Sequence, residues 1–169
     1  MPEVKYTLYD TAVFGVTANT EFLLFQVRQG ADATHTENFT NSRGPGVMPQ
    51  SEKFVIQQID IFPDFKVLEA NSMTWFLASV FEIKLADKSL LKVPMAMCLG
   101  ENNWTGSDAS TAAADQAHVG LMNGGYPLAD KPIELAAGEV FVVRVLQGTA
   151  AAASSNVKVA LTGLLTFPG

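Results

Sequence analysis

Apolar and polar residues alternate most regularly in two segments near the end of the chain, residues 141–146 and 157–167. The residues that share one face are Phe141, Val143 and Val145 in the first segment, and Val157, Val159, Leu161, Leu165 and Phe167 in the second. Lys158, Thr162 and Thr166 fall on the opposite face. A period of two with one apolar face is typical of antiparallel strands that cover a core. We expect two strands that close a final hairpin through the small residues 148–156.

The same alternation predicts strands along most of the chain. The segments are residues 6–14, 22–27, 54–62, 81–85, 91–97, 126–128 and 133–135. Within residues 54–62 the apolar positions change parity, which predicts a β-bulge near Gln57 and Gln58. Pro94 has no amide hydrogen to donate, so it predicts a sheet edge or a bulge. Residues 65–79 follow helical spacing in part, and we expect one short helix there.

Two long polar segments separate these strands, residues 30–52 and 100–125. The Gly44-Pro45-Gly46 sequence sets turn geometry in the first, and residues 109–117 of the second could form a helical turn. Loops of more than about 15 residues are uncommon in compact domains unless they have a function. We expect functional surface loops, or arms that become ordered against a neighbouring molecule. Strands resume directly after residue 125, so the second segment is interpreted as a loop within a domain.

These elements predict an all-β fold. The expected architecture is an antiparallel two-sheet sandwich, and within that class an eight-stranded single jelly roll with long loops. The length of 169 residues fits one domain that spans residues 1–169. A chain of this size buries about 70% of its unfolded surface, so a single hydrophobic core is sufficient.

The composition is poor in charge, with 48% hydrophobic and 17% charged residues. Two explanations are open: a subunit with extensive interfaces, or an ordinary sandwich with polar uncharged loops. The formal net charge is −6, and Lys and Arg form no cluster that could follow a phosphate backbone. We therefore expect no direct contact with nucleic acid.

Cys98 is the only cysteine, so the chain forms no internal disulfide, and its apolar neighbours predict a buried thiol. No segment approaches the roughly 20 apolar residues of a membrane-spanning helix. Residues 1–10 lack the basic start and hydrophobic segment of a signal peptide. We expect a soluble protein that is made in the cytoplasm and is not exported.

Candidate catalytic and metal-binding residues are few and scattered. His35 and His118 lie in different loops, each near a carboxylate, whereas a metal site needs three or four converging ligands. Cys98 has no basic neighbour that would activate its thiol, and no Gly-x-Ser-x-Gly motif is present. We predict no catalytic residue, no cofactor, no metal ion and no small-molecule substrate. The protein is expected not to be an enzyme.

The two tryptophans differ in their surroundings. Trp75 lies in an apolar stretch and is expected in the core, whereas Trp104 follows Asn102 and Asn103 in a polar segment. Three interpretations of Trp104 are open: partial burial, an anchor for a protein partner, or stacking on a sugar ring.

The order of the elements, with two long loops and a closing strand that contains Val157-Lys158-Val159-Ala160-Leu161-Thr162-Gly163, resembles that of a known family. It is similar to the single jelly-roll capsid proteins of tailless icosahedral phages. More narrowly, it looks like the small major capsid proteins of phages that contain an internal membrane and build their shell from two kinds of upright barrel. The likeness is architectural and covers most of the chain. It implies a virion shell subunit that assembles with itself and with a larger capsid protein around a membrane vesicle, and it assigns no site residue.

The first functional hypothesis is therefore a viral capsid subunit, with residues 32–49 and 102–126 as contact loops. The candidate contact residues are Asp32, His35, Asn38, Phe39, Arg43, Asn103, Trp104, Asp108 and Tyr126. The alternative is a carbohydrate- or receptor-binding β-sandwich module. In that case the binding residues are Trp104, Asn102, Asn103 and Asp108.

Overall fold

The structure, a computed structural model, describes residues 2–63, 76–99, 125–151 and 154–167. Most of the regular structure in these residues is β-strand. The strands are β1 (Glu3–Phe14), β2 (Thr20–Leu24), β3 (Lys53–Pro63), β4 (Val80–Leu85), β5 (Lys88–Pro94), β6 (Tyr126–Pro127), β7 (Ile133–Leu135), β8 (Phe141–Gln147) and β9 (Ser155–Thr166). A short 3-10 helix, η1 (Met95–Cys98), follows β5.

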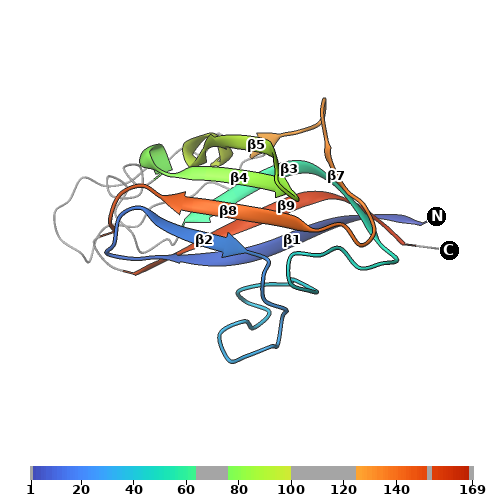
Figure 1. Ribbon diagram of the computed structural model, residues 1–169, viewed down its shortest axis with the longest axis horizontal. Coiled ribbons are helices and arrows are strands. Elements are labelled where there is room, and N and C mark those ends of the chain that lie inside the picture. The colour runs from blue at the N-terminus through green and yellow to red at the C-terminus, as the bar shows by residue number, and fades with distance from the viewer. Residues whose placement is uncertain (1, 64–75, 100–124, 152–153, 168–169) are drawn as a thin grey trace.

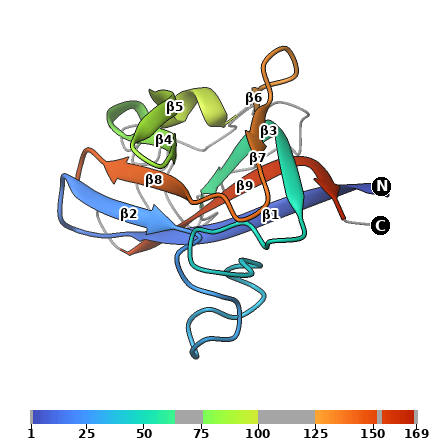
Figure 2. The ribbon, with the colours of Figure 1, turned by 45° about the vertical axis from the view of Figure 1, so that its right-hand side comes forward.

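The strands form two antiparallel sheets packed on a shared core (Figures 1 and 2). Sheet A has the order β1-β9-β3-β6, with β7 also paired to β3, and sheet B has the order β2-β8-β4-β5. The pairs are nested along the chain: β1 pairs with β9, β2 with β8, β3 with β6 and β7, and β4 with β5. A long antiparallel hairpin rolled into two sheets produces this nesting, so the fold is a jelly roll. The predicted all-β antiparallel sandwich is confirmed.

The alternation along each strand decides which side chains enter the core. Phe141, Val143 and Val145 of β8 are at most 3% exposed, whereas the residues between them are only partly buried. From β9, the buried apolar residues are Val157, Val159, Ala160, Leu161 and Leu165. Burial of one large aliphatic or aromatic side chain contributes about 1.5–3 kcal/mol. The two regular segments that the sequence shows therefore hold the two sheets together.

β3 requires an irregularity to bury all of its isoleucines. Its register with β9 shifts between Ile56 and Gln58, which leaves Gln57 as an extra residue. Ile56, Ile59 and Ile61 are each at most 1% exposed. In a regular strand Ile59 and Ile61 would point to the face opposite Ile56. The predicted bulge is thus confirmed, and it keeps three large side chains in one core.

The final hairpin predicted from the sequence is wrong. β8 pairs with β2 and β4 in sheet B, whereas β9 pairs with β1 and β3 in sheet A. The connection between β8 and β9 therefore crosses from one sheet to the other. Alternation gives the face that a strand buries but does not specify the strand with which it pairs. The prediction that these two consecutive strands pair with each other therefore rested only on their order in the sequence.

The strand predicted over residues 91–97 ends early. β5 stops at Pro94, and Met95–Cys98 form η1. β5 is the last strand of sheet B, so the predicted edge position of Pro94 is confirmed. Cys98 is buried, as predicted, and burial together with the charge of Asp60 raises the pKa of its thiol to about 12.

Other predictions fall partly outside the described residues. Of the helix expected within residues 65–79, only residues 76–79 are described, and residues 76–78 are helical. The helical turn expected at residues 109–117 lies outside the described residues. Along the part of the chain that the structure describes, no helix combines the length and the apolar character needed to cross a membrane.

Candidate functional site

The β2–β3 loop, residues 25–52, connects the two sheets. It leaves sheet B after β2, projects from the sandwich and returns to sheet A at β3 (Figures 1 and 2). The loop contains the candidate contact residues Asp32, His35, Asn38, Phe39 and Arg43. Its position depends on contacts with β1 and β9.

Asn41 holds the loop against β1, which is the edge strand of sheet A. The side-chain oxygen of Asn41 accepts a hydrogen bond from Tyr9 N (2.7 Å), and its side-chain nitrogen donates to Thr7 O (2.7 Å). The backbone N of Asn41 donates to Tyr9 O (3.1 Å), and the Thr11 hydroxyl donates to Phe39 O (2.8 Å). The loop thus occupies backbone groups of an edge strand that another strand could otherwise pair with.

Asp10 joins the two ends of the loop to β1. Its carboxylate accepts hydrogen bonds from Phe25 N (2.5 Å) and Thr11 N (2.9 Å), and the Thr40 side chain is a further partner. Asp10 is 7% exposed. Burial raises the pKa of its carboxyl, although these hydrogen bonds and the charge of His35 act in the opposite direction. Because Phe25 begins the loop and Thr40 lies on its return, one carboxylate fixes both parts.

Asp32 and His35 organise the exposed end of the loop. Asp32 Oδ1 accepts hydrogen bonds from Thr34 N (2.8 Å) and His35 N (2.9 Å), and His35 Nδ1 lies 2.8 Å from the same oxygen. Hydrogen bonds from the Thr34 side chain, from His35 and from their backbone amides hold the pKa of Asp32 well below its usual range. The exposed end therefore has a defined shape and keeps a negative charge near neutral pH.

Lys158 of β9 fixes the loop from the outer face of sheet A. Lys158 Nζ donates to Asn38 O (2.8 Å) and lies 5.0 Å from the centroid of the Tyr9 ring. The Tyr9 hydroxyl donates to Glu37 O (2.5 Å). An exposed cation–π contact contributes about 0.5–1 kcal/mol. These contacts hold residues 37 and 38 on the sheet through their backbone and leave their side chains exposed.

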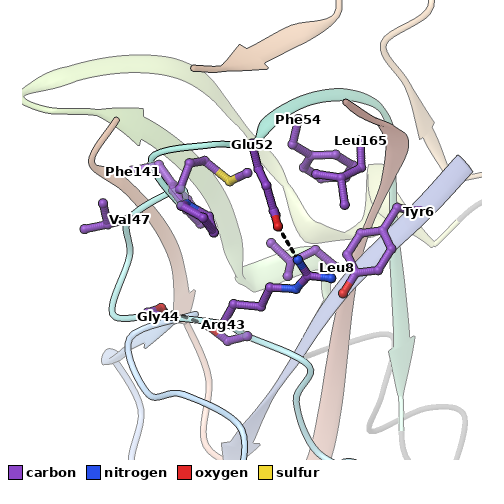
Figure 3. A pocket seen from close by; sticks show the side chains of 12 residues that line it. Tyr6, Leu8, Arg43, Gly44, Val47, Glu52, Phe54, Phe141 and Leu165 are labelled. Atoms are coloured by element: carbon purple, nitrogen blue, oxygen red, sulfur yellow. Dashed lines mark hydrogen bonds and ion pairs between the residues drawn. The ribbon is translucent and has the colours of Figure 1, made fainter. Parts of the chain in front are cut away.

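A cavity of about 30 Å³ lies between the loop and the end of the sandwich (Figure 3). Its apolar lining includes Leu8, Phe54, Phe141 and Leu165, from four different strands. Arg43 also lines it, pairs with Glu52 (2.5 Å) and lies 5.5 Å from the centroid of the Tyr6 ring. Small-molecule sites usually have volumes of about 300–1,000 Å³. This cavity has room for water or one methyl group rather than for a metabolite or a sugar.

A wider hollow of about 530 Å³ adjoins this cavity at Glu52. Its lining residues are Glu3, Gln50, Ser51, Glu52, Lys53, Ala137, Thr166 and Phe167. Two of the charged side chains already have partners, because Glu52 pairs with Arg43 and Lys53 pairs with Glu134 (2.7 Å). The hollow contains no histidine or cysteine, and its chemistry is that of strand ends and a polar turn.

The structure brings Asp32 and His35 into direct contact and places Arg43 at the other end of the same loop, beside Glu52. Tyr126 lies in β6, opposite Ile59, and packs against the core. The remaining candidates, Asn102, Asn103, Trp104 and Asp108, lie outside the described residues, as does His118. Within the described ranges, no group of three or more His, Cys, Asp or Glu side chains could hold a metal ion.

Two residues that position the loop were not identified from the sequence, Asp10 and Asn41. Asp10 had a detectable signal, since it occupies an inward position between Leu8 and Ala12 in an otherwise apolar alternation. A charged residue at such a position needs a buried partner. Asn41 had no comparable signal, because its partners are backbone groups of a strand about thirty residues earlier.

Comparison of the chain with models of protein families and with curated proteins gives no match. The fold therefore defines the class of protein: an antiparallel jelly-roll sandwich whose long β2–β3 loop is fixed to an edge strand.

Proposed function

We propose that this protein is a structural subunit of a viral capsid, which associates with copies of itself and with a second capsid protein. The observation that carries the proposal is the β2–β3 loop, which projects from the sandwich while its backbone is held on β1. Jelly rolls form many viral capsids, but they also occur in lectins and cupins. The fold alone does not distinguish a capsid subunit from these other classes, so the proposal depends on the loop as well.

A loop that is fixed before association is suited to contacts between subunits. Ordering the backbone of one free residue costs about 1–2 kcal/mol. Hydrogen bonds that involve Asp10, Asn41 and Lys158 order parts of the β2–β3 loop when the chain folds, so part of this entropy is already lost before association. The exposed residues between them are therefore presented in one shape, and a partner loses less entropy when it binds them.

Exposed apolar side chains offer further contact surface. Among the described residues, the exposed large hydrophobic side chains are Val4, Val13, Val16, Leu23, Val47, Leu77, Leu90, Met97 and Val140. Single exposed hydrophobic residues are ordinary on any protein. Val47 of the loop and Val140, however, pair in an isolated antiparallel β-bridge, so two of these exposed valines lie side by side.

The size of the assemblies formed by the full chain tests this proposal. We expect oligomers that grow with concentration in light scattering, and regular particles or sheets in negative-stain microscopy, for the chain alone or with co-encoded capsid proteins. A chain that stays monomeric under all of these conditions contradicts the proposal.

The Asn41→Ala variant tests the role of the loop. It removes the hydrogen bonds to Thr7 O and Tyr9 N, so we expect association to weaken at least about tenfold, equivalent to 1.4 kcal/mol. Circular dichroism checks that the sandwich is still folded. Asn156→Ala is the matched control, because Asn156 is an exposed residue of β9 outside the β2–β3 loop. Equal association of the two variants would contradict a role of the loop in contacts between subunits.

A further inference from the structure

The β4–β5 hairpin, residues 80–94, lies at the side of the sandwich opposite the β2–β3 loop. β5 is one edge of sheet B, and β2, from which the loop starts, is the other edge. In Figure 1 the loop projects below the sandwich and β5 lies along its top. A subunit thus presents two different surfaces, the loop and the hairpin, at opposite edges.

The hairpin exposes positive charge on an acidic protein. Lys88 and Lys92 are exposed and Lys84 is partly exposed, whereas Glu82 is only 4% exposed. Glu82 is also occupied within the sheet, since its carboxylate lies 2.9 Å from Arg144 Nε. The remaining acid of the hairpin, Asp87, is exposed in the turn. Because the whole chain has a net charge of −6, a positively charged edge is attracted to acidic segments of another copy.

Features of β5 prevent another strand from pairing with it. Exposed lysines, Pro94 and a register shift between Ile83 and Lys84 are devices that protect edge strands from strand addition. A partner must therefore contact the side chains of the hairpin and not its backbone. Leu90 is the extra residue of β5 at this register shift, and it is 38% exposed. Lys88 lies opposite Leu85 and Lys92 lies opposite Glu82, so the shift places the two lysines on opposite faces of the edge strand.

The exposed end of the β2–β3 loop has the complementary chemistry. Residues 30–41 contain Asp32 and Glu37 and no Lys or Arg, and both acids are exposed. The nearby cation Lys158 contacts this segment through Asn38 O and the Tyr9 ring, on the side that faces sheet A. The hydrogen bonds to Asp32 keep its carboxylate charged and in place.

We propose that the β2–β3 loop of one copy docks on the exposed edge of the β4–β5 hairpin of a second copy, with Asp32 and Glu37 on the two sides of that edge, beside Lys88 and Lys92. This inference rests on the proposed function as an assembly subunit and names the surface that meets the loop. Because the two surfaces differ, the contact is head-to-tail, and its repetition leads to a closed ring or an open array.

Charge reversal on each surface, followed by their combination, tests the pairing. Lys88→Glu with Lys92→Glu keeps the edge charged, and so still protected from strand addition, but reverses its sign. Ala33→Lys with Glu37→Lys reverses the loop and leaves Asp32, which organises the loop, in place. We expect each pair to raise the concentration for half-maximal assembly at least about tenfold, and the combined variant to recover most of that loss.

The control pair is Lys5→Glu with Lys131→Glu, two exposed lysines outside both surfaces. It changes the net charge as much as the hairpin pair does, and we expect less than about a threefold effect. Circular dichroism and thermal unfolding verify that every variant is folded.

The outcomes separate the two proposals. If the unmodified chain assembles and the hairpin and loop variants behave like the control, or if the combined variant shows no recovery, the docking is wrong and the proposed function stands. If the unmodified chain never assembles, alone or with co-encoded capsid proteins, both are overturned.

Discussion

At the scale of single residues, the position of the β2–β3 loop depends on a buried carboxylate. Asp10 loses most of its hydration on folding, and hydrogen bonds from Phe25 N and Thr11 N replace only part of it. The raised pKa of Asp10 reflects this imbalance. The group is therefore costly to charge, yet its removal leaves two backbone donors without their acceptor.

Asp10→Ala should lower the free energy of unfolding by about 1–3 kcal/mol, because buried N–H groups that lose their partner incur a desolvation penalty. Urea denaturation measures the difference. Asp87→Ala, in the exposed β4–β5 turn, is the control and should change the free energy by less than about 0.5 kcal/mol. Equal effects of the two variants would contradict the structural role of Asp10.

The raised pKa of Asp10 also predicts how stability depends on pH. Between the ordinary value of 3.8 and the raised value, the folded protein binds more protons at this group than the unfolded chain does. Asp10 therefore makes the free energy of unfolding increase as pH falls through the raised pKa, and its contribution is constant below 3.8. Urea denaturation between pH 7 and pH 4 should show the wild-type chain gaining stability relative to Asp10→Asn. A relative loss on acidification would contradict the environment described for Asp10.

At the scale of elements, the strands could be predicted from the sequence but their pairing could not. The alternation of apolar and polar residues reports which face of a strand is buried. It therefore predicted the strands, and its change of parity predicted the bulge of β3. Pairing depends on contacts across the whole chain, which alternation does not contain. The end of β5 at Pro94 was missed for a related reason, since Met95 continues the apolar alternation although its backbone is in η1.

Gly163 shows how closely two elements approach. It lies opposite Ile56, next to the bulge of β3, and a Cβ atom at this position would be 1.9 Å from Val55 O. Gly163→Ala must separate β9 from β3 and should destabilise the fold by about 2–3 kcal/mol in thermal or urea unfolding. Gly15→Ala is the matched control, because nothing lies within 4 Å of its Cβ position. Comparable stability of the two variants would rule out this packing.

At the scale of the whole molecule, the nested strand order gives a rigid sandwich with different chemistry at its two edges. The β2–β3 loop covers part of edge strand β1, and the lysines and proline of β5 protect the opposite edge. The edge strands β1 and β5 are thus protected from uncontrolled strand pairing, while their side chains are available to partners. The sequence indicated the loop through its length and polarity, but its attachment to β1 required the fold.

The most direct test of the proposed assembly is the mass of the full chain in sedimentation velocity over a wide concentration range, measured alone and with co-encoded proteins. We expect a mass that increases with concentration toward a discrete assembly, and a loss of that assembly in Asn41→Ala but not in Asn156→Ala. A single monomeric species at every concentration and in every mixture would contradict the proposed assembly.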